Sequence, residues 1–412
     1  MNRNALKELI SHKESGFRKP FLLYGTNGTG KTWLALDFAR SFFSQYLYVN
    51  LEHKPNAAHF FSEKILSGAT VSEAVAQFFQ MEEEYLSEIL VIFDEITYCP
   101  ALFLACEKNV SCPLLLISGS VPEPEVLAHF QAKHMYPMTF DEFLDAVGSG
   151  WYIDMIQGHY EKKESVPNIV HQDLLALFEE YLEVGGMPSV INEYVTTNSP
   201  DTVAEQQYCS LIRIQDYLCK NSEPSDSTKA LQIMNVMTEQ LERSNKNFKF
   251  NTIRKGITYN MVEDSLKSLV RIGAVIKTDE FERNNDSSGN FKLYYPDVGL
   301  LSYSLFGNTS EQIRKAKLEN YLMEQFSANG WNELSFWESK GMAKVDILLK
   351  KDGITTPVEI RDSNVGKGKS IVTFFEKNSS DKNFYFRFCN ENLDSTDVCY
   401  QLPFYAAFCI KP

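Results

Sequence analysis

A glycine-rich segment, GTNGTGKT, constrains the fold of this 412-residue chain more than any other. The apolar run Phe21 to Tyr24 precedes it and an amphipathic run from Trp33 follows it, which predicts a strand, a tight turn and a helix. Glycines let such a turn wrap around a phosphate chain and point N–H groups inward. The alternative is a glycine turn without a ligand. The predicted phosphate-binding residues are Gly25, Thr26, Asn27, Gly28, Thr29, Gly30, Lys31 and Thr32.

Two side chains at the end of this segment have complementary chemistry. Lys31 is expected to reach the β- and γ-phosphates of a nucleotide, and Thr32 to place its hydroxyl on Mg²⁺. The start of the following helix adds a partial positive charge that faces the same anion. The segment therefore predicts a nucleotide site with Mg²⁺, although the residues alone do not distinguish adenine from guanine.

Two carboxylates follow another predicted strand. The run Ile89 to Phe93 leads directly into Asp94 and Glu95, at the end of a strand where open parallel sheets bind ligands. Asp94 is expected to hold Mg²⁺, and Glu95 to orient or deprotonate the attacking water as the catalytic residue. The alternative is an acidic N-cap for a helix that begins near Cys99.

Three further strands complete the predicted sheet. One is Tyr46 to Leu51, and another is Pro113 to Ile117, after which Ser118 and Ser120 are expected to sense the γ-phosphate. A serine-rich turn is the alternative for these two residues. The last strand is expected near Met135 to Met138, before a capping box formed by Thr139 and Glu142. Five strands with intervening helices predict an α/β sheet covered on both faces.

Charge and cysteine usage limit the class of protein. The net charge of −14 argues against an electrostatic grip of the whole chain on nucleic acid, so any such contact must be local. The eight cysteines contain no C-x-x-C pair and lie in apolar segments, which predicts reduced core residues. No apolar run approaches the length of a membrane span, and the N-terminus does not resemble a signal peptide. We expect a cytoplasmic protein with no membrane partner.

Composition and turn signals divide the chain into four predicted domains. Residues 1–150 form the nucleotide-binding domain, and the helix-rich segment 151–225 is expected to act as a lid, with pure packing as the alternative. Residues 226–307 show helix, helix, helix and hairpin, which is a winged-helix pattern. Its third helix is expected to bury Val262, Leu266, Leu269 and Val270. Residues 308–412 form the last domain, with strands expected at Lys344 to Leu349, Thr356 to Ile360, Phe384 to Phe388 and Phe404 to Ile410.

The predicted winged helix carries a small positive charge. Residues 240–285 contain nine lysine and arginine against six aspartate and glutamate residues, a net charge of +3. Lys249, Arg254 and Lys255 are the predicted DNA contacts, with Lys267 and Arg283 as further candidates. Contacts with a protein partner, or a role as a spacer, are equally open for this domain.

The last domain carries the order of carboxylates found in some nucleases. Glu319 is expected on a helix, Asp346 on one strand, and Glu359 with Arg361 on the next. This resembles the restriction-endonuclease-like pattern, in which two carboxylates hold Mg²⁺ and a lysine positions water. Arginine stays protonated and does not fit the compact site of a lysine, so we predict a vestigial nuclease. Charged residues at exposed strand ends are the alternative.

Several segments in order also resemble one protein family. They are GTNGTGKT, YVNLE, LVIFDEITYCP, LISGS with YPMTFDEFL, LLALFEEYLEVGGMPSVINEY, FKLYYPDVGLLSYSL, and KVDILL with PVEIRD. Together they resemble the bacterial and archaeal AAA-type ATPases with a C-terminal domain of unknown function. The resemblance implies ATP as the nucleotide and the roles given above for Lys31, Thr32, Asp94 and Glu95. One departure is a short stretch from Phe130 to His134, which leaves a trans-acting arginine unassigned.

The resulting prediction is an α/β protein with a P-loop AAA-type parallel sheet, a helical lid, a winged helix and a C-terminal restriction-endonuclease-like α/β domain. Its leading function is Mg²⁺-dependent ATP hydrolysis coupled to an unknown partner, either DNA or a protein. The alternatives are a nucleotide-gated binding switch with negligible turnover and an ATP-gated nuclease. The expected partners are ATP, the macromolecule bound by the winged helix, and further copies of the chain in a homo-oligomer.

Overall fold

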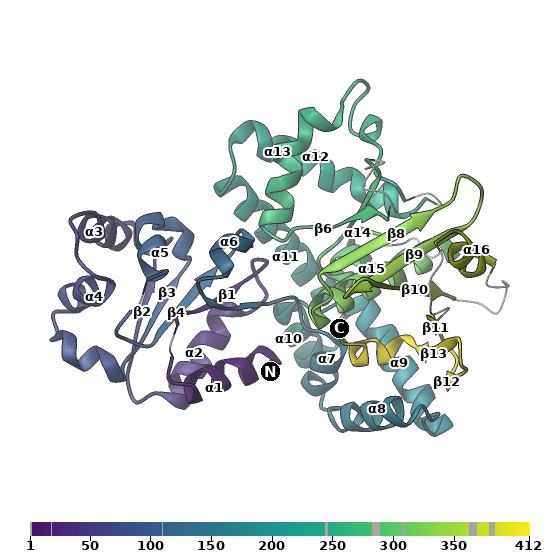
Figure 1. Cartoon of the computed structure of the whole chain (residues 1–412), viewed down its shortest axis with the longest axis horizontal. Coiled ribbons are helices and arrows are strands. Elements are labelled where there is room, and N and C mark those ends of the chain that lie inside the picture. Colours follow the sequence, from purple (N-terminus) through teal and green to yellow (C-terminus); the bar gives the residue numbers. More distant parts are fainter. Residues whose placement is uncertain are drawn as a thin grey trace. The chain divides into compact units, whose positions relative to one another are not determined.

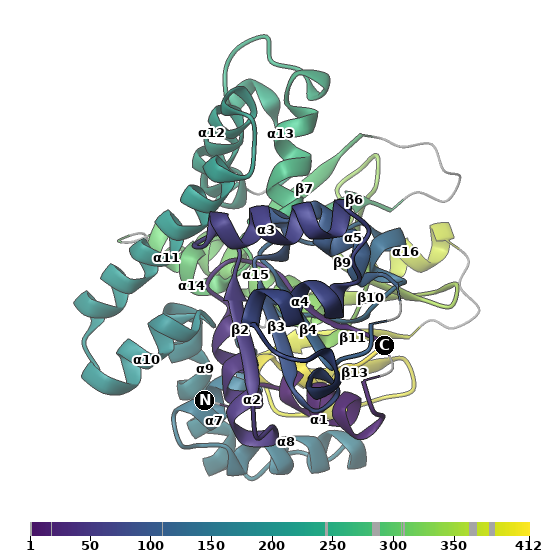
Figure 2. The ribbon, with the colours of Figure 1, turned by 90° about the vertical axis from the view of Figure 1, so that its left-hand side faces the viewer.

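The computed structural model describes residues 2–17, 19–108, 110–243, 246–281, 289–305, 307, 310–361, 369–378 and 384–412. They form two compact units, labelled along the chain in Figures 1 and 2. The N-terminal unit contains Asn2–Tyr136 with Arg271–Gly273, and the C-terminal unit contains Pro137–Val270 with Ala274–Pro412. The four predicted domains therefore stay a prediction, because packing groups the chain into these two units.

A five-stranded parallel sheet is the centre of the N-terminal unit. Its order is β2-β3-β4-β1-β5, and every neighbouring pair is parallel, so the carboxyl ends of all five strands lie at one edge. The strands are β1 (Phe21–Tyr24), β2 (Tyr46–Asn50), β3 (Leu90–Asp94), β4 (Leu114–Ser118) and β5 (Gln131–His134). The helices are α1 (Ala5–Glu14), α2 (Lys31–Phe42), α3 (Pro55–Leu66), α4 (Val71–Phe79), η1 (Glu83–Glu88), η2 (Ile96–Tyr98), α5 (Pro100–Cys106) and α6 (Pro124–Leu127).

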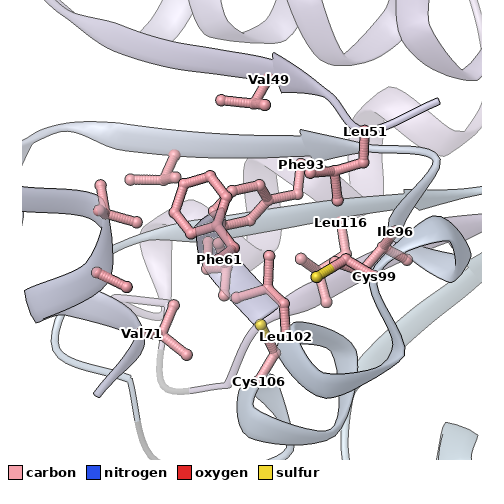
Figure 3. Packing of buried hydrophobic residues seen from close by; sticks show 14 of the residues in the cluster. Val49, Leu51, Phe61, Val71, Phe93, Ile96, Cys99, Leu102, Cys106 and Leu116 are labelled. Carbon is pink, nitrogen blue, oxygen red and sulfur yellow. The ribbon is translucent and has the colours of Figure 1, made fainter. Parts of the chain in front are cut away.

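Successive residues of the central strands point to opposite faces, and both faces are buried. On one face, Phe21 and Ile92 pack with Leu34 and Phe38 of α2 and with α1. On the other face, Phe93 and its neighbours pack against α3, α4 and α5, and Figure 3 shows this cluster around Phe61. The predicted α/β sheet covered on both faces is confirmed.

The fifth strand was placed four residues too far along the chain. The structure has β5 at Gln131–His134, whereas the sequence predicted Met135 to Met138. This is an edge strand with one exposed and three half-buried residues, so its sequence is polar and the apolar run after it was mistaken for the strand. The capping box is present, because the Glu142 carboxylate accepts from the backbone N–H of Thr139 at 3.2 Å.

The C-terminal unit combines a layer of helices with an eight-stranded mixed sheet of order β12-β13-β11-β10-β9-β8-β6-β7. Its strands are β6 (Ile276–Glu280), β7 (Phe291–Tyr294), β8 (Glu333–Glu338), β9 (Lys344–Lys351), β10 (Ile354–Ile360), β11 (Tyr385–Cys389), β12 (Asp394–Ser395) and β13 (Cys399–Pro403). Its helices are α7 (Phe140–Ala146), α8 (Trp151–Lys162), α9 (Asn168–Val184), α10 (Pro188–Thr197), α11 (Pro200–Lys220), α12 (Pro224–Leu241), η3 (Phe250–Thr252), α13 (Tyr259–Arg271), α14 (Val298–Ser304), α15 (Glu311–Asn329), α16 (Lys369–Asn378) and η4 (Phe404–Cys409).

Aromatic side chains join the helices of this unit. The Phe178 ring of α9 lies 4.8 Å from that of Tyr321 in α15 and stacks on Phe404 of η4 at 5.7 Å. Phe140 of α7 contacts Phe178 edge to face. These contacts fix α15, which carries Glu319, against the rest of the unit.

Two predicted features of the C-terminal unit differ in the structure. Residues Phe404 to Ile410, expected as a strand, include the 3₁₀ helix η4, which begins directly after Pro403 ends β13. Val270 is 38% exposed, although Val262, Leu266 and Leu269 are buried as expected.

The predicted wing is part of a larger sheet. Helices α12 and α13, the hairpin β6–β7 and the short η3 occur in the expected order. However, β6 pairs with β8 in parallel, so the hairpin extends the eight-stranded sheet instead of standing alone. The winged-helix assignment therefore stays a prediction.

The cysteines differ in their exposure to solvent. Cys209 and Cys219 are exposed on α11, so they are not the core residues that were expected, whereas Cys99, Cys106 and Cys389 are buried. Within the described ranges, the structure contains no helix of the length and apolarity that a membrane span requires.

Candidate functional site

The glycine-rich loop connects β1 to α2 at the carboxyl edge of the sheet. Gly25, Gly28 and Gly30 have positive φ angles of 137°, 91° and 88°, which other residues rarely adopt. A Cβ atom on Gly25 would lie 2.4 Å from the Met135 carbonyl oxygen and 2.9 Å from Cδ2 of His134. The close approach of the chain after β5 therefore requires glycine at the first loop position.

Lys31, the first residue of α2, is folded back onto its own loop. Its ammonium donates to the carbonyl oxygens of Gly25 and Thr26, both at 2.8 Å, and the residue is 5% exposed. Burial lowers the pKa of Lys31 to about 8, against the opposing effect of Glu95 and Asp94. The amine is still mainly charged at neutral pH, so it can pair with an anion that enters the loop.

Asp94 collects hydrogen bonds from three side chains at the end of β3. Its Oδ2 accepts from the Thr32 hydroxyl at 2.9 Å, from the Tyr48 hydroxyl at 2.7 Å and from Asn50 at 3.3 Å. The register explains this arrangement, because Asn50 of β2 pairs with Asp94, and Tyr48 lies two residues earlier on the same face. The structure thus brings together Thr32 and Asp94, the two predicted Mg²⁺ ligands, and both offer the oxygen atoms that Mg²⁺ prefers.

Glu95 follows Asp94 in a left-handed conformation, with φ of 54° and ψ of 51°. Such a backbone is uncommon for a residue other than glycine, and it occurs often at functional sites. The Glu95 N–H donates to Asp94 Oδ1 at 3.0 Å. The N-cap residue of α5 is Cys99, so the alternative interpretation of an acidic cap on this helix is wrong. Glu95 is the N-cap residue of the short η2, and its side chain makes no capping hydrogen bond there.

Ser118 lies between the loop and the acidic pair in the order of the strands. It pairs with Tyr24, the residue before the loop, and β4 separates β1 from β3. Its hydroxyl donates to the Ser120 carbonyl at 2.7 Å and accepts from the Ser120 N–H at 3.1 Å. This is the serine turn that was the alternative, and γ-phosphate sensing by Ser118 or Ser120 stays a prediction.

Three contributions to this site were missed in the sequence. Arg3 donates to the Thr29 carbonyl at 2.5 Å and to the Tyr136 carbonyl at 2.7 Å, and it therefore ties the loop to the segment after β5. Tyr48 and Asn50 contact Asp94 from the neighbouring strand. No motif marks Arg3, but the polar residues of YVNLE at the end of β2 were a usable signal.

The predicted nuclease residues lie in the C-terminal unit. Glu319 of α15 and Asp346 of β9 both contact the Lys292 ammonium, at 3.3 and 3.9 Å. Glu359 of β10 pairs instead with Arg361 at 3.1 Å and with Arg387 of β11 at 2.9 Å. The carboxylates are therefore each neutralised by a cationic side chain.

The predicted DNA contacts are accessible. Lys249, Arg254 and Lys255 are exposed around η3 and the turn before α13. Lys267 is also exposed and pairs with Glu263 on α13 at 3.0 Å. Arg283 lies outside the described residues.

Comparison with protein families assigns the loop-bearing segment. Residues 17–144 match the family model of an AAA domain. This segment is therefore similar to AAA domains. Residues 175–312, in the C-terminal unit, match a domain of unknown function, DUF8612. The AAA match covers the loop, Asp94, Glu95 and Ser118, whereas residues 313–412 are matched by neither family.

Solved structures give a weaker likeness. The Walker-type ATPase of Pyrococcus abyssi is 14% identical over 74% of this chain and 95% of that chain, with a TM-score of 0.44. DnaA from Aquifex aeolicus, bound to AMPPCP, is 14% identical over 66% of this chain and 86% of that chain, with a TM-score of 0.27. Drosophila ORC bound to DNA is 12% identical over 73% of this chain and 85% of that chain, also with a TM-score of 0.27. The search of curated proteins found no match.

Proposed function

We propose that the AAA domain binds Mg²⁺ and ATP and hydrolyses the γ-phosphate, and that the C-terminal unit transmits the nucleotide state to a partner. The observation that carries the proposal is the hydrogen bond of 2.9 Å between Thr32 and Asp94, beside a loop whose lysine is buried and charged. Two oxygen donors from different elements meet where the loop would present the phosphates of a nucleotide. The AAA family match supports ATP over GTP.

Each residue of the site has a separate role in this proposal. The backbone N–H groups of the loop cradle the phosphates, and Lys31 exchanges its bonds with the Gly25 and Thr26 carbonyls for bonds with phosphate oxygens. Thr32 and Asp94 would hold Mg²⁺, which neutralises charge on the phosphates when bound. Glu95 orients a water molecule and accepts its proton.

The test is calorimetric titration of the purified protein with ATP in MgCl₂. The proposal predicts one saturable site per chain, and weaker binding when EDTA replaces MgCl₂. A protein that is folded by circular dichroism and gives no saturable heat would contradict it.

DNA is the partner favoured by the exposed cationic side chains around η3. We expect the triple variant with alanine at Lys249, Arg254 and Lys255 to lose most of its affinity for duplex DNA. Each phosphate contact that is removed lowers the slope of log K against log salt by about 1, because fewer counterions are released. Fluorescence anisotropy at several salt concentrations measures both effects.

The control for this experiment is Lys7→Ala, at an exposed position of α1 in the N-terminal unit. Unchanged affinity and salt slope in the triple variant would exclude this surface, and the proposed partner would then be a protein.

The ATP-gated nuclease is tested separately. We expect no metal-dependent cleavage of plasmid or linear DNA, with or without ATP, because Arg361 takes the place of the lysine and lies 3.1 Å from Glu359 in an ion pair. Gel electrophoresis after incubation with Mg²⁺ or Mn²⁺ is the measurement. Cleavage that disappears in Asp346→Ala would show an active nuclease and reverse this prediction.

A further inference from the structure

Five charged side chains, four of them largely buried, form a group in the described part of the C-terminal unit that we call the carboxylate–lysine cluster. Its carboxylates are Glu319 and Asp346, whose side chains are 0% and 10% exposed. Its ammonium groups belong to Lys246, Lys292 and Lys315, which are 7%, 3% and 37% exposed. Buried charges of this kind are rare unless they are paired.

Lys292 stands between the two carboxylates. Its Nζ lies 3.3 Å from Glu319 Oε1 and 3.9 Å from Asp346 Oδ1, and 4.5 Å from the centre of the Phe336 ring. The outer oxygens have their own partners, because Lys246 donates to Glu319 Oε2 at 2.5 Å and Lys315 contacts Asp346 Oδ2 at 3.0 Å. Glu319 Oε1 and Asp346 Oδ1 therefore both contact the same ammonium group, that of Lys292.

The lysines favour the ionised form of both carboxylates. Burial alone would raise the pKa of Glu319, but Lys246 and Lys292 hold it below its ordinary value. Burial would also raise the pKa of Asp346, but Lys292, Lys315 and Lys246 hold this pKa below its ordinary range. Glu319 and Asp346 in turn raise the pKa of Lys292 against the effect of burial. Among the described side chains, three lysine amines thus face two carboxylates, and burial lowers the pKa of one of them, Lys246.

Two buried carboxylates that face one gap are the usual oxygen ligands of a divalent cation. We propose that the Lys292 ammonium occupies the position of such a cation between Glu319 and Asp346, so that the native protein takes no metal there and removal of Lys292 opens a divalent-cation site. Within the described part of the chain, no three His, Cys, Asp or Glu side chains are grouped to hold a metal. A cation at the opened site would accordingly bind to these two carboxylates and complete its shell with water.

The β6–β7 hairpin supplies the substituting cation. Lys292 and Tyr294 are two residues apart on β7, so their side chains point to the same face of the sheet. The Tyr294 hydroxyl donates to Glu319 Oε1 at 2.6 Å. The same hairpin pairs with β8 of the eight-stranded sheet. This inference is independent of the proposed ATPase, since it concerns only side chains of the C-terminal unit.

The experiment is thermal unfolding of nucleotide-free Lys292→Ala in EDTA, CaCl₂ or MnCl₂. Saturating cation is expected to raise the Tm of the variant by about 5 °C or more, because a ligand that binds only the folded state stabilises it. The native protein should show no comparable rise. Lys350→Ala, which removes a half-exposed lysine of β9, is the matched control and should behave like the native protein.

The double variant Lys292→Ala with Asp346→Asn locates the response. It keeps the vacancy but loses one of the two carboxylates, so the Tm rise should disappear. A folded Lys292→Ala protein whose Tm does not respond to either cation would overturn the proposal.

A second measurement does not depend on the folding of Lys292→Ala. Electron paramagnetic resonance measures how much added Mn²⁺ is bound by the protein. The native protein and Asp346→Asn are expected to bind the same amount. Bound Mn²⁺ that is lost in Asp346→Asn would overturn the proposal, because Lys292 would then not be occupying the cation position.

Discussion

Lys31→Ala is expected to weaken binding of ATP with Mg²⁺ by about a hundredfold or more, since hydrogen bonds to charged groups contribute roughly 1.5–3 kcal/mol each. The variant loses the ammonium that now bonds to the Gly25 and Thr26 carbonyls and that would move to the phosphates. Titration calorimetry measures the change. Lys7→Ala, at an exposed position of α1, is the matched control and should bind like the native protein.

The same titration can contradict the assignment. Affinity within about threefold of the native value in Lys31→Ala, which corresponds to less than about 1 kcal/mol, would mean that the lysine does not contact the phosphates. The loop would then lack its main cationic ligand.

Glu95→Gln is expected to reduce hydrolysis by about a hundredfold or more and to leave ATP affinity nearly unchanged. Glutamine keeps the size of the side chain but cannot accept a proton from water, and general base catalysis contributes roughly 10²–10⁴-fold. Phosphate release under single-turnover conditions, together with the binding titration, measures both quantities.

The control for this variant is Glu88→Gln, an exposed residue at the end of η1. Its rate should equal that of the native protein. An unchanged rate in Glu95→Gln would remove the catalytic role from this residue, and the strained backbone at Glu95 would need another explanation.

The nucleotide-binding loop could be predicted because its signal is local. Strand, glycine turn and helix are contiguous from Phe21 to Trp33, and the positive φ angles at Gly25, Gly28 and Gly30 are the conformations that glycine permits. The acidic pair was found for the same reason, since an apolar strand ends directly in Asp94. Both segments lie in the part of the chain that matches the AAA family.

The remaining parts of the site depend on contacts between distant segments. Arg3 contacts Thr29 across 26 positions, and Tyr48 contacts Asp94 across 46, so neither contact leaves a spacing pattern in the sequence. The position of β5 was missed because none of the residues of this edge strand is buried, so its sequence has no apolar run. Phe404 to Ile410 was mistaken for a strand because periodicity does not separate a buried 3₁₀ helix from a buried strand.

The C-terminal carboxylates show the same limit. Their order along the chain was sufficient to predict a nuclease-like pattern, with Arg361 as the reason for inactivity. The lysines that face Glu319 and Asp346 come from β7, from the segment after α12, and from the start of α15, the helix that also carries Glu319. Only the tertiary structure brings Lys246, Lys292 and Lys315 together, so no sequence motif could have named them.

The most direct measurement of the central claim is steady-state release of phosphate by the purified native protein in ATP and Mg²⁺, with and without duplex DNA. An ATPase in which Asp94 and Glu95 act on metal and water predicts continuous release that stops on addition of EDTA. Stimulation by DNA would also support the proposed partner. Saturable ATP binding with no release under either condition would contradict the claim and leave a nucleotide-gated switch as the function of the N-terminal unit.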